Sequence, residues 1–132
     1  AGTATASTAP LKFTSGTNLT SPENGAVEYN GTNYFVTSGS TRYTLAKTLT
    51  NTATLNFGST SAGSSADLTI TVTGAADGDA VSLAVPNAAV LSNSSYTAWV
   101  SAADTVTVRF NNYSSGSQDP ASGTFRVSII KY

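Results

Sequence analysis

The chain contains no cysteine, no histidine and no methionine. Without cysteine it forms no disulfide and has no thiolate nucleophile, and without histidine the Ser-His-Asp triad and most zinc sites are excluded. Acid–base chemistry would fall to the seven carboxylates, whose spacing does not place two of them across a cleft as a glycosidase requires. We therefore expect a non-enzymatic protein without a cofactor. Because methionine is absent, we also expect the sequence to be a piece of a longer chain.

Charge is scarce as well. Charged residues make up 10% of the 132 residues, against about 25% in an ordinary soluble domain. The net charge is −1 and the six basic residues are scattered, so nothing indicates binding to nucleic acid or to an anionic membrane. No apolar run approaches the roughly 20 residues of a membrane-spanning helix. We expect no nucleic-acid partner and no membrane insertion.

The β-branched residues threonine and valine are abundant, and apolar residues alternate with small polar ones, as in half-buried strands. Turn residues separate about six such runs in the second half of the chain. This pattern predicts an all-β fold, an antiparallel β-sandwich of jelly-roll or immunoglobulin-like type. The predicted strands are 53–57, 67–73, 80–85, 95–101, 104–111 and 123–131. The predicted organisation is a flexible leader (1–10), a β-meander stem or collar (11–50, with 47–52 as a polar bridge) and the sandwich knob (51–132).

The stretch Gly25–Val36 predicts a hairpin. Its Asn30-Gly31 pair lies between two extended runs and suits a type I′ turn. A second return leads to Arg42–Leu45, which gives a meander of about twenty residues, too small to bury its own apolar side chains. We therefore predict that another surface covers them, as contacts between subunits. The residues concerned are Val27, Tyr29, Phe35, Tyr43 and Leu45.

A longer pattern includes this hairpin. From Leu11 onward the chain reads L-K-F-T-S-G-T-x-L-T-x-P-x-x-G-A-x-E-Y-x-G-T-x-x-F-x-T, followed by Arg42. This segment resembles one that is common in bacteriophage tail-fibre and related virion fibre proteins. The runs 101–109 and 123–127 are similar to C-terminal domains of the same proteins. The resemblance implies three chains wrapped about one axis, with a terminal β-domain exposed on the virion, and it brings no catalytic or binding residue.

Trp99 is the most informative single residue. It alternates with Tyr96, Ala98 and Val100 and therefore shares a face with polar neighbours. On that face it would either seal a contact between subunits or stack on a sugar, and if both faces are covered it belongs to the core. Tyr96 is kept as a second candidate contact residue. Tyr113, in the polar loop 112–118, is a candidate for receptor binding or an ordinary loop residue.

Several charged residues have structural and functional interpretations. Asp77-Gly78-Asp79 resembles part of a calcium loop, but the other ligands of such a loop are absent and the same residues are ordinary in a turn. We favour the turn, and we expect Asp104 to cap the turn at 102–103 in the same way. Arginines within the strands are expected to pair with Glu28 or Asp67. These arginines are Arg42, Arg109 and Arg126.

These features together predict a structural protein of a virion. The chain is expected to be the distal part of a homotrimeric phage fibre, which attaches to a host-surface glycan or protein receptor and contacts other virion proteins. One alternative is a capsid decoration or head-fibre protein. The other is a bacterial surface adhesin or carbohydrate-binding module, which predicts a monomer whose sugar binding is lost on Trp99→Ala.

Overall fold

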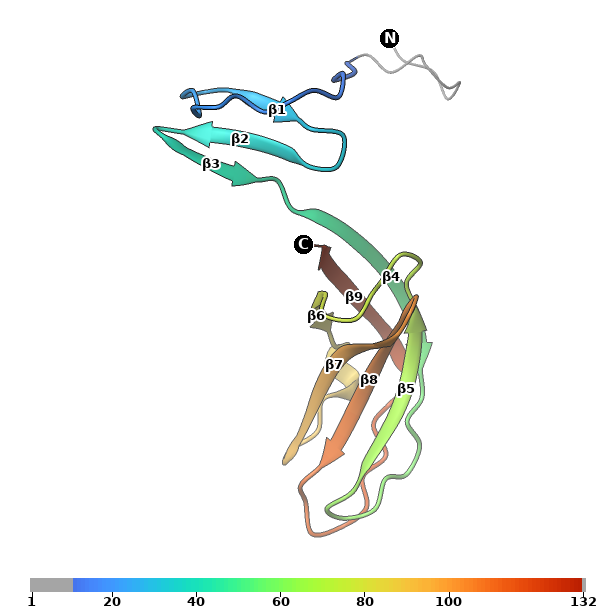
Figure 1. Cartoon of the computed structure of the whole chain (residues 1–132). Helices are drawn as coiled ribbons and strands as arrows, with labels where there is room; N and C mark the ends of the chain where they lie inside the picture. The colour runs from blue at the N-terminus through green and yellow to red at the C-terminus, as the bar shows by residue number, and fades with distance from the viewer. Residues whose placement is uncertain (1–10, 132) are drawn as a thin grey trace. The chain divides into compact units, whose positions relative to one another are not determined.

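A computed structural model describes residues 11–131, so the predicted leader 1–10 lies outside the described residues. Within that range the chain is all-β, with nine strands and one short 3-10 helix, η1 (Asn87–Ala89) (Figure 1). The chain divides into two compact units: unit 1 ends at Leu45 and unit 2 begins at Ala46. Among the described residues, no helix is long and apolar enough to cross a membrane.

Unit 1 contains the predicted meander. Its antiparallel sheet has the order β1-β2-β3, with β1 (Val27–Tyr29), β2 (Tyr34–Ser38) and β3 (Thr41–Thr44). The turn between β1 and β2 is longer than predicted, because Tyr29 pairs with Tyr34 and leaves a loop of four residues instead of two. The side chain of Asn30 closes this loop by accepting hydrogen bonds from the backbone N–H groups of Thr32 and Asn33, at 3.0 and 2.8 Å.

The two faces of this sheet differ in chemistry. Val27, Val36 and Tyr43 lie directly opposite one another on the three strands. Because side chains alternate along a strand, Tyr29 and Tyr34 share their face. We call this set, with Leu45, the apolar face of unit 1. Phe35 does not belong to it, because the register places Phe35 on the other side with Glu28 and Arg42. Its role as a subunit contact stays a prediction.

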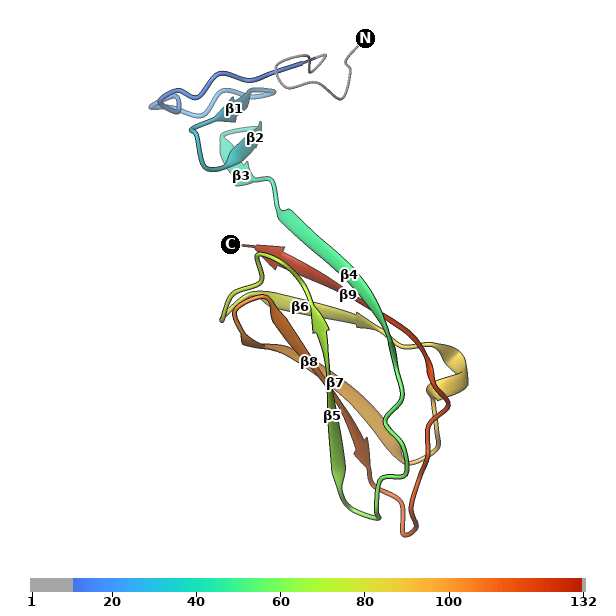
Figure 2. The same ribbon diagram turned by 90° about the vertical axis from the view of Figure 1, so that its right-hand side faces the viewer.

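Unit 2 is a β-sandwich-like arrangement of two three-stranded antiparallel sheets (Figure 2). One sheet has the order β4-β9-β6 and the other the order β5-β8-β7. The six strands predicted for this half of the chain are all present; the choice between a jelly-roll and an immunoglobulin-like type stays a prediction. The strands are β4 (Lys47–Leu55), β5 (Ser65–Thr71), β6 (Ala80–Ala84), β7 (Ser94–Ala102), β8 (Thr105–Asn112) and β9 (Gly123–Lys131).

The predicted polar bridge 47–52 is wrong, because these residues begin β4. Lys47 pairs with Lys131, and the pairing continues without interruption to Leu55 opposite Gly123. Threonines on alternate positions of β4 face outward, and threonine suits a strand even where its side chain stays exposed. The boundary between the units therefore lies after Leu45, five residues before the predicted one.

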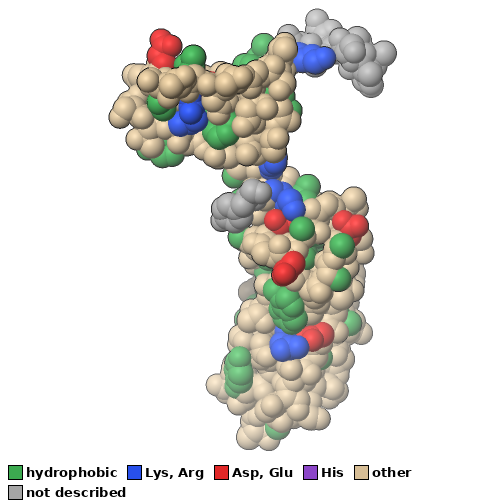
Figure 3. All heavy atoms as spheres, in the orientation of Figure 1, with side chains coloured by type: hydrophobic (Ala, Val, Ile, Leu, Met, Phe, Trp, Pro, Cys, Tyr) green, Lys and Arg blue, Asp and Glu red, His purple; other side chains and the backbone are tan. Residues whose placement is uncertain are grey.

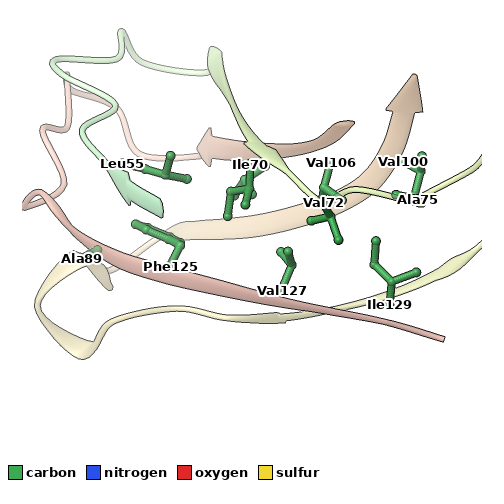
Figure 4. Close-up of a cluster of buried hydrophobic side chains, with 11 residues drawn as sticks. Leu55, Ile70, Val72, Ala75, Ala89, Val100, Val106, Phe125, Val127 and Ile129 are labelled. Carbon is green, nitrogen blue, oxygen red and sulfur yellow. The ribbon is translucent and has the colours of Figure 1, made fainter. Parts of the chain in front are cut away.

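The core of unit 2 lies between the two sheets (Figure 4). Most of its fully buried side chains come from β8 and β9, the central strands of the two sheets, and these side chains point toward each other. An aromatic cluster fills one end: Phe57 and Tyr96 pack on each other and on both Phe110 and Phe125, with ring centroids 5.2–6.0 Å apart. The fully buried hydrophobic residues of the central strands are Val106, Val108, Phe110, Phe125, Val127 and Ile129.

Asn112, at the end of β8, organises the loops at one end of unit 2. It is 1% exposed, and its amide nitrogen donates to the carbonyl oxygens of Thr60, Ser61 and Gly116 at 2.8–3.1 Å. Its side-chain oxygen accepts from both the backbone N–H and the hydroxyl of Ser114. One side chain thus ties the loop before β5 to the loop between β8 and β9, and holds both in one conformation.

We predict that Asn112→Ala destabilises unit 2. The substitution removes the five hydrogen bonds of a buried side chain, each worth about 0.5–1.5 kcal/mol net, so the free energy of unfolding should fall by at least about 2 kcal/mol. Urea unfolding followed by the fluorescence of Trp99, the single tryptophan, measures the change. The matched control is Asn111→Ala, which removes only a 3.3 Å hydrogen bond to Ser95 and should cost less than about 1 kcal/mol. Equal losses in the two variants would contradict the role of Asn112.

Candidate functional site

The first candidate surface is the apolar face of unit 1. Tyr43 is 53% exposed, Val27 is 50% exposed and Leu45 is 44% exposed. Tyr34 stacks on Tyr29 with ring centroids 4.4 Å apart, and Phe13 packs edge-on against Tyr34 at 5.9 Å. Among the described residues of unit 1, no hydrophobic side chain is buried, and the one buried residue is Thr37. The sheet thus has an organised apolar face without a core of its own.

The charges of the same sheet lie on its opposite face. Arg42 forms two hydrogen bonds to the Glu28 carboxylate, at 2.7 and 3.2 Å. The backbone N–H of Leu19 donates to that carboxylate and the Leu19 carbonyl accepts from Arg42, both at 2.6 Å. The hydrogen bond from Leu19, together with Arg42, lowers the pKa of Glu28. Both charged groups of the sheet are therefore engaged, and the apolar face carries no charge.

A shallow groove of about 370 Å³ lies beside β1, between that strand and residues 13–19. Phe13, Leu19, Val27 and Glu28 are among the residues that line it. The Glu28 carboxylate is already bonded to Arg42 and Leu19. The groove therefore extends the exposed apolar surface of unit 1 and offers no free charge to a ligand.

The second candidate surface is the outer side of sheet β5-β8-β7 in unit 2, which we call the Trp99 face. Trp99 is 38% exposed, so the prediction that it lies on the outward face is confirmed and its placement in the core is wrong. The Arg109 guanidinium lies over the indole, 5.0 Å from the ring centroid. The residues of this face are Asp67 and Thr69 from β5, Thr107, Arg109 and Asn111 from β8, and Ser95, Thr97, Trp99 and Ser101 from β7.

Arg109 also forms a two-pronged ion pair across the sheet. Its Nε and one terminal nitrogen each donate to an oxygen of Asp67 at 2.7 Å. The hydrogen bonds from Arg109 lower the pKa of Asp67, and Asp67 in turn raises the pKa of Arg109. A row of three contacting side chains, Trp99, Arg109 and Asp67, therefore crosses all three strands in a fixed order. Figure 3 shows unit 2 with mainly uncharged surface and an acidic side chain beside a basic one.

Hydroxyl groups lie on the surface of the sheet beside the Trp99 indole. Thr107 lies directly opposite Trp99 in the register and is 6% exposed. Its hydroxyl donates to the Ser101 hydroxyl at 2.7 Å. The indole therefore lies beside a hydrogen-bonded pair of hydroxyl groups, and the Arg109 guanidinium lies over its ring.

The structure brings Tyr113 to the same face. Tyr113 is 67% exposed, and its hydroxyl lies 3.1 Å from the Ser95 hydroxyl. Asn111 donates to that same Ser95 hydroxyl, and the backbone N–H of Tyr113 donates to the carbonyl of Asn93. Tyr113 is thus anchored at one end of the Trp99 face, a relationship that the sequence did not indicate.

Tyr96 lies elsewhere. Its ring belongs to the aromatic cluster of the core, and its hydroxyl donates to the Ala89 carbonyl at 3.0 Å. Burial raises its pKa to about 12. The structure therefore separates Tyr96 from Trp99 and Tyr113, and gives it a structural role instead of a place on the contact surface.

The aspartates of the turns make structural contacts. Asp79 accepts hydrogen bonds from the Ala76 N–H at 2.8 Å and from Lys131 at 2.7 Å. Within residues 11–131 no three His, Cys, Asp or Glu side chains are grouped to hold a metal ion. Asp104 accepts from the Gly74 N–H at 2.6 Å, so it ties two loops together instead of capping its own turn as predicted. The expected pairs Arg42–Glu28 and Arg109–Asp67 are both present.

No family model matches the chain, and comparison with curated proteins and with solved structures also gave no match.

The raised pKa of Tyr96 predicts a loss of stability at alkaline pH. In the unfolded chain this phenol ionises near its ordinary pKa of 10, whereas in the folded protein it holds its proton to about 12. Its contribution is complete below pH 10 and is lost as the pH rises toward 12, because the unfolded state then releases the proton first. Thermal unfolding measured by circular dichroism across this range should show the loss, and Tyr96→Phe should reduce it. An identical alkaline decline in Tyr96→Phe would contradict the assignment.

Proposed function

We propose that this chain is a non-enzymatic attachment module of a virion, the distal part of a trimeric phage fibre. The observation that carries the proposal is the uncharged apolar face of unit 1, organised but exposed. A sheet that is hydrophobic on one face buries that face against another element, and an exposed apolar patch marks an interaction site. In our proposal the covering surface is the same face of other copies of the chain.

The chemistry of the apolar face supports a self-association. The row Val27–Val36–Tyr43 contributes aliphatic and aromatic surface, and Tyr34 and Tyr29 add two further rings. The Glu28–Arg42 pair lies on the opposite face, so no charge is buried and no like charges meet when copies come together. The resemblance of residues 11–42 to virion fibre proteins supports three copies around one axis.

Unit 2 differs in having a core of its own. It does not need the assembly to fold, and it serves in the proposal as the displayed attachment domain. Three copies placed close together multiply a weak interaction, because each further contact forms at a high effective concentration. The proposed mechanism is therefore passive attachment by avidity, with the virion surface as the location and a host-surface glycan or protein as the partner.

The assembly is tested by a pair of neighbouring substitutions on β3. Tyr43→Asp puts a carboxylate on the apolar face, and burying it without a partner costs several kcal/mol. Light scattering coupled to size exclusion should show a trimer for the native chain and a monomer for Tyr43→Asp. Trp99 fluorescence should stay unchanged, since the core of unit 2 is not altered.

The matched control is Thr44→Asp. Thr44 is exposed and pairs with Phe35, on the opposite face from Tyr43. This variant carries the same added charge one residue away and should remain a trimer. A native chain that is monomeric, or a Tyr43→Asp variant that stays trimeric, would refute the proposed role of the apolar face.

A further inference from the structure

The Trp99 face holds two exposed aromatic side chains in fixed positions on one sheet. Trp99 on β7 lies opposite Thr107 on β8. Tyr113 lies six residues after Thr107, just beyond the end of β8. At about 3.3 Å per residue of strand, the backbones of Thr107 and Tyr113 are about 20 Å apart, and the Tyr113 hydroxyl reaches back to Ser95, which lies four residues or about 13 Å from Trp99 along β7. Both are held by side-chain contacts, Trp99 by Arg109 and Tyr113 by Ser95. The face therefore has two rigid apolar positions joined by polar side chains.

The side chains between them carry no net charge. Asp67 and Arg109 neutralise each other in a two-pronged pair whose side chains are each 41% exposed. The pair uses two of the guanidinium N–H donors, which leaves other donors and acceptor lone pairs toward solvent. The rest of this strip is made of hydroxyl and amide groups, among them Thr97, Ser95 and Asn111. A surface of this kind offers donors and acceptors without favouring a charged ligand.

We propose that the Trp99 face binds a linear, uncharged oligosaccharide that lies along β7 and β8. A pyranose ring has an apolar face of C–H groups that stacks on an indole or phenol, and hydroxyl groups at its edge that need both donors and acceptors. Trp99 and Tyr113 provide the two stacking positions, and Arg109 and Asp67 bond to hydroxyls of the sugar units between them. This inference rests on the proposed attachment function and names its ligand class.

Rigidity favours this ligand. The cation–π contact and the ion pair order the long arginine side chain before any ligand arrives. Asn112 fixes the loop that carries Tyr113 by bonding to Ser114 and Gly116. Because little side-chain freedom remains to be lost on binding, weak sugar contacts retain more of their free energy.

Binding is tested with the intact chain and four neutral hexasaccharides: linear oligomers of α-linked glucose, β-linked glucose, N-acetylglucosamine and mannose. The matching disaccharides and a hyaluronan hexasaccharide, which is anionic, complete the panel. Titration followed by Trp99 fluorescence should show saturable binding of at least one neutral hexasaccharide, and weaker binding of the anionic one. No binding of any neutral hexasaccharide would overturn the proposal.

Three substitutions assign the site, with affinities measured by calorimetry. Trp99→Ala should weaken binding of the hexasaccharide and of the disaccharide at least about tenfold. Tyr113→Ala should weaken the hexasaccharide by a similar factor and leave the disaccharide unchanged, because only the longer ligand reaches both rings. The control Ile130→Ala removes an exposed apolar side chain from the other sheet and should bind normally. Unchanged affinity in Trp99→Ala would refute the site.

The oligomeric state separates this inference from the proposed function. If Trp99→Ala converts a trimer into a monomer, the face is a contact between copies and the glycan site is overturned. The Tyr43→Asp variant should retain the affinity of each chain for the hexasaccharide while losing avidity for an immobilised polysaccharide. Sugar binding by a chain that proves monomeric would refute the trimer and support the glycan site.

Discussion

The packing of β8 against β9 determines what unit 2 presents to its surroundings. These are the central strands of the two sheets, and their inward side chains from Val106 to Phe110 and from Phe125 to Ile129 are fully buried. Successive side chains of a strand point to opposite faces of the sheet. Burying Phe110 therefore places its neighbours Arg109 and Asn111 on the outer surface. A shift of one residue would bury the arginine and expose the core. The register that stabilises the fold therefore also sets the composition of the Trp99 face.

Unit 1 shows the same alternation without the second sheet. Its strands separate Val27, Val36 and Tyr43 from Glu28 and Arg42 as cleanly as the strands of unit 2 separate their two sides. The apolar side nevertheless remains exposed, because within the described part of unit 1 only Phe13 packs onto it through a ring contact. The sheets of both units alternate apolar and polar side chains, but only unit 2 covers its apolar faces by itself. This difference is the physical basis for the proposal that unit 1 serves assembly and unit 2 serves attachment.

The sequence predicted correctly the features that depend on the alternation of apolar and polar residues. It failed where the conformation depends on one side chain or on pairing with a strand far away in the sequence. The six strands of unit 2 and the outward position of Trp99 follow from period-two patterning alone. The start of β4 was missed because Lys47–Thr52 is polar, and its strand conformation depends on hydrogen bonding with β9, about eighty residues later. The predicted loop of two residues and the observed loop of four both place Phe35 on the face opposite Val27, so the separation of these two residues follows from strand alternation and not from the loop. The role of Asn112 was not predicted, since nothing local distinguishes it from Asn111.

The low charge of the chain has a structural consequence in both units. Three of its six basic residues form ion pairs within their own unit, Arg42 with Glu28, Arg109 with Asp67 and Lys131 with Asp79. The exposed Arg109–Asp67 pair adds little to stability. Each of the three pairs fixes a side chain while leaving the local net charge near zero. Surfaces of this kind allow several copies to lie close together without repulsion. They also suit neutral, hydroxyl-rich ligands, which are recognised by stacking and directed hydrogen bonds instead of by long-range attraction.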